Sequence, residues 1–180
     1  MFVQIEITPN PNSLKFIPGE TVSNSGSFEI TKKEETKNEL ARNLLSINGV
    51  TGIFLGSDFI SINKSENVDW GDVKHIVISL INDFYSSGKK FVVDKSLDEE
   101  NDPEFGEIEK QIIKILDTKI RPAVAKDGGD IKFKEFKNGV VKVELQGSCS
   151  GCPSSTMTLK QGVENLLCHY LPEVKEVIAI

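Results

Sequence analysis

The sequence has little cysteine and no long apolar run. Only three of its 180 residues are cysteine, too few for the disulfide framework of a small secreted domain, so we expect a reducing compartment. No stretch approaches the roughly 18 apolar residues of a membrane span, so we expect no membrane partner. The first residues lack the features of a signal peptide and of an arginine-rich transit peptide. With Met1 at the start, this predicts a bacterial cytoplasmic protein rather than a mature organellar one.

An excess of basic charge is also absent. The formal net charge is −6 at pH 7, which argues against a nucleic-acid partner, because phosphate recognition needs a basic surface. The acidic excess is local, since residues 91–105 carry one basic and six acidic side chains. Such a run cannot bury itself, so it predicts a solvated linker in preference to an acidic docking motif. We therefore predict two small domains, residues 1–90 and 106–180, joined by this linker.

Residues 1–90 predict an α+β domain without obvious chemistry. Two amphipathic helices should follow N-terminal caps, the first in a capping box that begins at Thr36 and the second at Asp69. The one histidine of this half, His75, falls on the polar side of the second helix and should be solvated rather than a ligand. Residues 22–30 show no clear pattern. Alternating apolar residues predict four strands, at residues 2–7, 13–17, 50–55 and 59–62.

Residues 106–180 predict the order helix, strand, strand, helix, strand. Pro122 should kink or end the first helix. Residues 127–130, Asp-Gly-Gly-Asp, are interpreted as a glycine C-cap and turn in preference to an acidic metal site. The final strand–helix–strand unit requires a right-handed crossover. The expected fold class is α+β with two small domains, the second α-β-β-α-β with a three-stranded mixed sheet and two helices.

The hairpin of this second domain can be placed in register. A three-residue loop at residues 137–139 pairs Ile131 with Leu145 and keeps one face apolar, whereas a two-residue loop would not. The expected cost is a pair of like charges, because Lys134 would then lie opposite Lys142.

The chemistry is concentrated in residues 147–156, GSCSGCPSST. A predicted strand leads into this stretch, and a helix should begin at Pro153. Cys149 and Cys152 would then lie at the N-terminus of a helix, where free N–H groups and the dipole favour the thiolate. A lone CxxC pair is compatible with half a zinc site, a dithiol redox pair or half an iron–sulfur site.

The third cysteine is too distant to join the same site. A helix rises 1.5 Å per residue, which places Cys168 roughly 20 Å from the pair, whereas a metal–sulfur bond is about 2.3 Å long. We expect Cys168 to be a partly exposed bystander. One chain thus supplies two thiolates where zinc or a cubane cluster needs four, and a second copy of the loop is the simplest completion.

Two other functions remain to be weighed against an iron–sulfur site. A thioredoxin-like oxidoreductase is disfavoured because too little chain follows Cys152 to build its sheet, and no catalytic constellation stands near the motif. We therefore predict no enzymatic activity. A structural zinc dimer is chemically allowed and stays open.

Four stretches resemble the Nfu family, the NifU-like iron–sulfur cluster scaffold and carrier proteins. Residues 8–16 (TPNPNSLKF) and 56–60 (GSDFI) are similar to the N-terminal domain of that family. Residues 127–131 (DGGDI) and 147–155 (GSCSGCPSS) are similar to its C-terminal NifU-like domain.

The resemblance implies a specific function for the cysteine pair. It makes Cys149 and Cys152 ligands of a labile [4Fe–4S] cluster that bridges two chains and is delivered to apo-proteins. The implied partners are apo iron–sulfur recipients, upstream cluster-assembly factors and a second copy of the chain, with a homodimer when loaded and a monomer when metal-free. Cys168 has no counterpart in the family motif.

Overall fold

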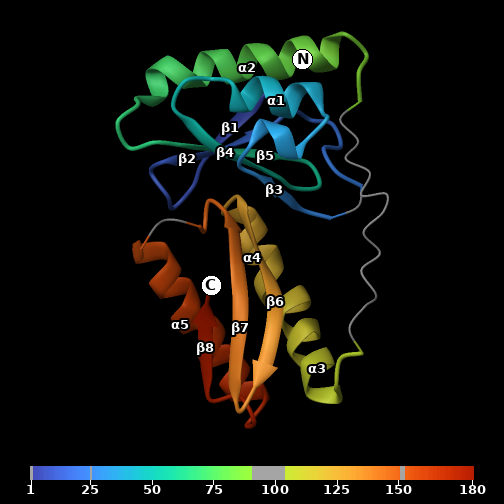
Figure 1. The fold of residues 1–180 in the computed structure, drawn as a ribbon, viewed down its shortest axis with the longest axis vertical. Coiled ribbons are helices and arrows are strands. Elements are labelled where there is room, and N and C mark those ends of the chain that lie inside the picture. Colours follow the sequence, from blue (N-terminus) through green and yellow to red (C-terminus); the bar gives the residue numbers. More distant parts are fainter. Residues whose placement is uncertain (1, 25, 91–103, 151–152) are drawn as a thin grey trace.

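The computed structural model describes residues 2–24, 26–90, 104–150 and 153–180, with the side chains of 153–155 left out. Figure 1 shows two α+β units stacked end to end, each with a sheet and its own helices. We call them the N-terminal domain (residues 2–90) and the C-terminal domain (residues 104–180). The α+β class is confirmed. Most of the predicted linker, residues 91–103, lies outside the described residues.

The N-terminal domain is built on an antiparallel five-stranded sheet with the order β1-β2-β5-β4-β3. All four predicted strands are present, and β3 is an additional short edge strand within the stretch that showed no pattern. The strands are β1 (Gln4–Ile7), β2 (Ser13–Ile17), β3 (Phe28–Ile30), β4 (Val50–Leu55) and β5 (Ile60–Lys64). The helices are the 3₁₀ turn η1 (Lys33–Glu35), α1 (Glu39–Leu45) and α2 (Trp70–Ser86).

Helices α1 and α2 cover one face of this sheet (Figure 1). The cap of α1 is Asn38 rather than the predicted Thr36, because Asn38 Oδ1 accepts from the Ala41 N–H at 3.0 Å. Thr36 instead supports the cap by accepting from the Asn38 N–H at 3.1 Å. Asp69 caps α2 as predicted, through the Gly71 N–H at 2.6 Å. The core under the helices includes Leu40, Leu44, Ile53, Leu55, Ile60, Ile62, Val73, Val77 and Ile81.

The other face of the sheet turns toward the C-terminal domain. Side chains alternate between the two faces of a strand, so the residues next to the core positions point away from the helices. Most of these residues are polar, and Phe54 is the large apolar one among them. We call this set the second sheet face: Lys15, Glu29, Phe54, Ser61 and Asn63. Ser61 and Phe54 are fully buried although they point away from the helices.

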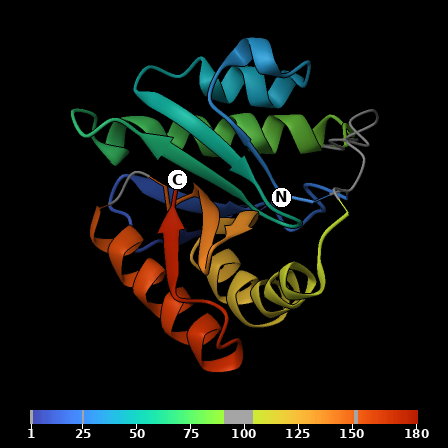
Figure 2. The same cartoon turned by 60° about the horizontal axis from the view of Figure 1, so that its bottom comes forward.

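The C-terminal domain has a three-stranded mixed sheet in the order β6-β7-β8, as predicted. β6 and β7 are antiparallel, and β7 and β8 are parallel. Figure 2 shows both helical segments on the same side of this sheet. The elements are α3 (Glu107–Ile115), η2 (Leu116–Ile120), α4 (Arg121–Lys126), β6 (Gly129–Lys137), β7 (Val140–Gly147), α5 (Pro153–Tyr170) and β8 (Glu176–Ala179).

Pro122 does not end the first helical segment, which runs on from α3 through η2 into α4. Its five-residue π-helical turn, η2, comes just before Pro122, which stands in the first turn of α4. Proline lacks the N–H that an α-helix would donate to the carbonyl four residues earlier, and a wider turn at this point accommodates that loss.

The hairpin confirms part of the predicted register and corrects its loop. Ile131 pairs with Leu145, but the loop has two residues, since Lys137 pairs with Val140. A bulge at Lys134 takes up the extra residue, which preserves the apolar face and removes the predicted like-charge pair. Lys142 lies 2.7 Å from Glu135 instead, and Lys134 lies 2.5 Å from Glu144.

Candidate functional site

The cysteine loop, residues 147–152, joins the end of β7 to the start of α5, as predicted. Cys149 is described, whereas Cys152 lies outside the described residues. The described part of this loop, residues 147–150, lies at the end of the C-terminal domain that faces the N-terminal domain (Figure 1).

The Asp-Gly-Gly-Asp turn lies directly beneath this loop. Gly128 adopts a left-handed φ of 83° after α4, which confirms the C-cap interpretation. Its carbonyl accepts from the Ser148 N–H at 3.2 Å, and the Ser148 hydroxyl donates to the Asp127 carbonyl. Gly147 also has a left-handed φ, of 70°, and a Cβ there would lie 2.6 Å from the Gly128 oxygen. The two motifs thus form one structural unit.

Cys149 is turned inward rather than toward solvent. Its side chain is 7% exposed and belongs to the core of the C-terminal domain. Gly129 makes room for it, since a Cβ at residue 129 would lie 2.8 Å from the Cys149 Sγ.

Burial controls the protonation of this thiol. It raises the pKa of Cys149 to about 11, with smaller contributions from the nearby Asp127 and Asp130 carboxylates and an opposing one from the Ser148 hydroxyl. Desolvation of the charged form thus acts against the thiolate, which the helix N-terminus was expected to favour.

Side chains of the N-terminal domain bind the backbone of the cysteine loop. Asn63 Nδ2 donates to the Gly147 carbonyl at 3.2 Å, and Asn10 Nδ2 donates to the Ser148 carbonyl at 3.1 Å. Glu29 Oε1 accepts from the Gly147 N–H at 3.1 Å and from the Ser150 hydroxyl at 3.3 Å.

The same interface continues into the turn beneath the loop. Ser61 Oγ donates to the Gly128 carbonyl at 2.7 Å. The approach needs a glycine at residue 128, because a Cβ there would lie only 2.7 Å from the same Ser61 oxygen. Lys15 Nζ reaches the Lys126 carbonyl at 3.4 Å.

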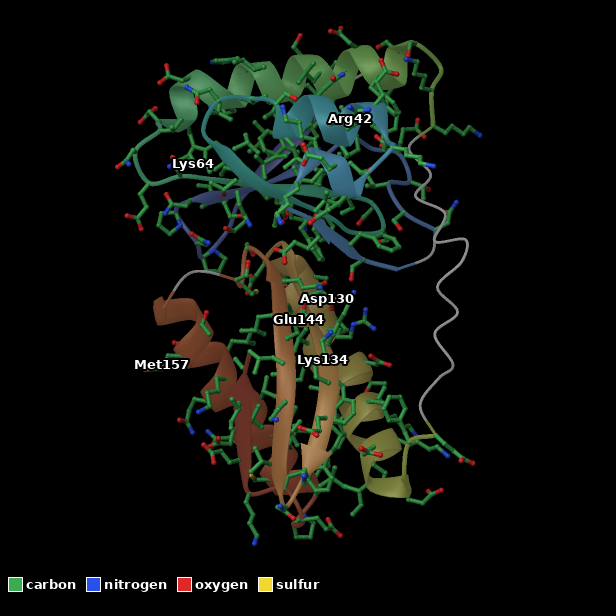
Figure 3. The ribbon with its side chains drawn as sticks, in the orientation of Figure 1. Arg42, Lys64, Asp130, Lys134, Glu144 and Met157 are labelled. Carbon is green, nitrogen blue, oxygen red and sulfur yellow. The ribbon has the colours of Figure 1, made fainter. Side chains whose placement is uncertain are left out.

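Asp130 is a structural carboxylate. Its oxygens accept from Arg121 Nε and Nη2, each at 2.9 Å, and the Ser27 hydroxyl also donates to it. Burial alone would raise the pKa of Asp130, but the hydrogen bonds from Arg121, Ser27 and the Ile131 N–H lower it below its ordinary value. Figure 3 shows Asp130 at the end of the hairpin nearest the N-terminal domain.

The part of the chain that the structure describes holds few side chains that could ligate a metal near the loop. Within the described residues, no three His, Cys, Asp or Glu side chains gather as a metal site would require. Cys168 is partly exposed near the C-terminal end of α5, at the opposite end of that helix from the loop. His75 is exposed, as predicted.

Sequence reasoning missed the residues that hold the loop. Glu29, Ser61 and Asn63 come from short strands whose polar positions indicate a solvated face. Asn10 lies in the stretch of residues 8–16 that resembles the Nfu family, but nothing in that stretch indicates what its side chain binds. No signal in a single sequence could have paired these residues with the cysteine loop or with the turn beneath it.

Two family descriptions match the chain. Residues 3–88 match "Scaffold protein Nfu/NifU N terminal", and residues 112–178 match "NifU-like domain". A solved NifU-like protein from Saccharomyces cerevisiae is 29% identical, with a TM-score of 0.48, over 53% of this chain and 87% of that one.

Curated relatives match almost the whole chain. "NifU-like protein 4, mitochondrial" from Arabidopsis thaliana is 42% identical over 98% of this chain and 65% of the relative. "NFU1 iron-sulfur cluster scaffold homolog, mitochondrial" from Homo sapiens is 44% identical over 98% of this chain and 71% of the relative. The chain thus spans about two thirds of the length of these relatives.

These relatives overturn the predicted location. The Arabidopsis and human relatives are all named as mitochondrial, at 41–44% identity, so the prediction of a bacterial cytoplasmic protein is wrong. Among the helices that the structure describes, none is long and apolar enough to span a membrane.

Proposed function

The chain belongs to the family of Nfu/NifU scaffold proteins, and from that premise we propose that it is an iron–sulfur cluster scaffold and carrier rather than an enzyme. Cys149 and Cys152 of two chains would hold a labile [4Fe–4S] cluster between them and deliver it to apo-proteins. The relatives' names support the scaffold role.

The observation that carries this proposal is the isolation of the cysteine loop from other ligands. Cys149 is a soft thiol donor at the strand–helix junction, and thiolates are the usual ligands of iron–sulfur clusters. Cys168 stands at the far end of α5, and the described residues offer no further ligand cluster. A four-thiolate site would therefore take its other half from a second chain.

The donor chemistry fits a cluster, but the present orientation of Cys149 does not. Its thiol is buried against Gly129 with a pKa raised to about 11. To act as a ligand, Cys149 would have to turn outward and lose its proton, for which an outward position near the N-terminus of α5 is electrostatically favourable.

The proposal also sets the partners and the location. Upstream assembly factors would supply the cluster, apo iron–sulfur proteins would receive it, and the chain would be a homodimer when loaded and a monomer when metal-free. We further propose an organellar, mitochondrial location, on the strength of the relatives' names.

The cysteine assignment is tested by anaerobic reconstitution with iron and sulfide. Cys149→Ser and Cys152→Ser should each abolish stable cluster loading, because each removes half of the ligands that one chain supplies. Cys168→Ser, the matched control, should load like the parent chain. Visible absorption and the iron and sulfide contents report the result. Full loading of Cys149→Ser, or a colourless parent protein that retains zinc, would contradict the proposal.

A further inference from the structure

The N-terminal domain lies on the cysteine loop (Figure 1) and binds the backbone carbonyls of Gly147 and Ser148, the two residues before Cys149. We propose that this domain clamps the loop in a closed state with Cys149 turned inward, and that the clamp must loosen before the loop can bind a cluster. The inference rests on the proposed cluster-binding role of Cys149.

The first part of the clamp is a rigid turn that presents Asn10. Thr8 fixes this turn, because its hydroxyl donates to the Asn10 carbonyl at 2.9 Å and accepts from the Asn10 N–H at 3.2 Å. The Asn10 side chain is oriented further by the Asn12 N–H, which donates to its Oδ1 at 2.9 Å. The amide nitrogen that remains donates to the Ser148 carbonyl, directly before Cys149.

Asn63 makes the matching contact one residue earlier, by donating to the Gly147 carbonyl at 3.2 Å. Asn63 belongs to β5, a central strand of its sheet, so this donor is held by a rigid element. The carbonyls of Gly147 and Ser148 are thus both bound by the N-terminal domain. A rotation of either peptide would break one of these hydrogen bonds.

Glu29 occupies donors that an anionic ligand of the loop would otherwise use. Its carboxylate accepts from the Gly147 N–H and the Ser150 hydroxyl, which flank Cys149 on either side. N–H groups near a helix N-terminus form an anion-binding environment. A thiolate-bound iron–sulfur cluster is itself an anion, so Glu29 would both compete for these donors and repel the cluster.

Cys149 lies between these contacts, and its thiol points toward Gly129. An iron atom shared with a second chain cannot be reached from this buried position. Turning Cys149 outward through the backbone moves the peptide before it, whose Ser148 carbonyl is bound by Asn10. It also moves the Gly147 groups that are bound by Asn63 and Glu29. The closed state therefore opposes cluster binding.

Thiol labelling of the metal-free full chain tests the clamp without any cluster. In a Cys152→Ser/Cys168→Ser background, Cys149 is the only thiol, and mass spectrometry gives its rate of alkylation by iodoacetamide. Asn63→Ala removes one clamp bond and should raise this rate roughly fivefold, the effect of a typical net hydrogen bond on an opening equilibrium. Adding Glu29→Ala should raise it by about tenfold or more.

Glu135→Ala is the matched control, because it removes a carboxylate that is paired with Lys142 on the hairpin and makes no contact with the loop. It should leave the labelling rate unchanged. Circular dichroism melts identify any variant that unfolds. If the double variant unfolds, the single Asn63→Ala variant decides the test. Equal labelling of the parent, clamp and control chains would overturn the proposal, because the C-terminal domain alone would then hold Cys149 inward.

The second measurement is the rate of anaerobic cluster loading in chains that keep all three cysteines. Asn63→Ala and Asn63→Ala/Glu29→Ala should load faster than the parent and the Glu135→Ala control. Faster labelling with unchanged loading would overturn the claim that the clamp opposes cluster binding. Failure of every chain to load would refute the proposed function instead, and the labelling rates would still decide whether the clamp exists.

Discussion

Replacing Asp130 by asparagine should destabilise the protein through its pairing with Arg121. The change keeps the shape of the side chain but removes the charge that receives two guanidinium hydrogen bonds of 2.9 Å. Hydrogen bonds to charged groups contribute roughly 1.5–3 kcal/mol and neutral ones roughly 0.5–1.5 kcal/mol. Losing about 1 kcal/mol at each of the two bonds gives an expected loss of about 2 kcal/mol in the free energy of unfolding.

The pH dependence of this loss separates charge from shape. The hydrogen bonds hold the pKa of folded Asp130 below its ordinary value of 3.8. Its contribution to stability is therefore complete above that ordinary value and disappears as the pH falls through the folded value. The amide of the Asp130→Asn variant does not titrate, so the two chains should differ at pH 7, and the difference should shrink as the pH falls below the ordinary value of Asp130. Urea unfolding followed by circular dichroism measures both. Equal midpoints at pH 7, or a difference that does not shrink as the pH falls below the ordinary value of 3.8, would refute the reasoning.

Two further predictions concern the domains. Gly129→Ala would place a Cβ 2.8 Å from the Cys149 Sγ and should lower the free energy of unfolding by about 1–3 kcal/mol; an unchanged urea midpoint would contradict this. Residues 1–90 and 104–180 should each fold alone, because each has its own core, and their amide NMR spectra should match the full chain except at the interface. Collapse of either spectrum would count against the domain boundary.

The sequence predicted the elements of this fold better than it predicted their contacts. Period-two alternation was enough to pair Ile131 with Leu145, because only that register keeps one face apolar. The bulge at Lys134 escaped prediction, since an inserted residue and a longer loop satisfy the same alternation equally well. The cap at Asn38 was missed for a similar reason, because Thr36 and Asn38 are both good cap residues.

The candidate site was predicted in part. The CxxC spacing and Pro153 placed the cysteine loop at a strand–helix junction without any structure. The burial that raises the pKa of Cys149 was not predicted, because the helix N-terminus is visible in the sequence and the burial of the thiol is not. The interface was missed because polar residues such as Ser61 and Asn63, alternating with core residues, look the same whether they face water or a second domain.

Anaerobic analytical ultracentrifugation of metal-free and reconstituted protein, with iron and sulfide determined on the same samples, tests the central claim most directly. One chain offers two thiolates in its cysteine loop, and Cys168 lies at the far end of α5. Metal-free protein should therefore sediment as a monomer, and loaded protein as a dimer with one four-iron cluster for each pair of chains. Removal of the cluster by a chelator should restore the monomer. A loaded monomer that holds a complete four-iron cluster without any added thiol such as glutathione would contradict ligation by two chains.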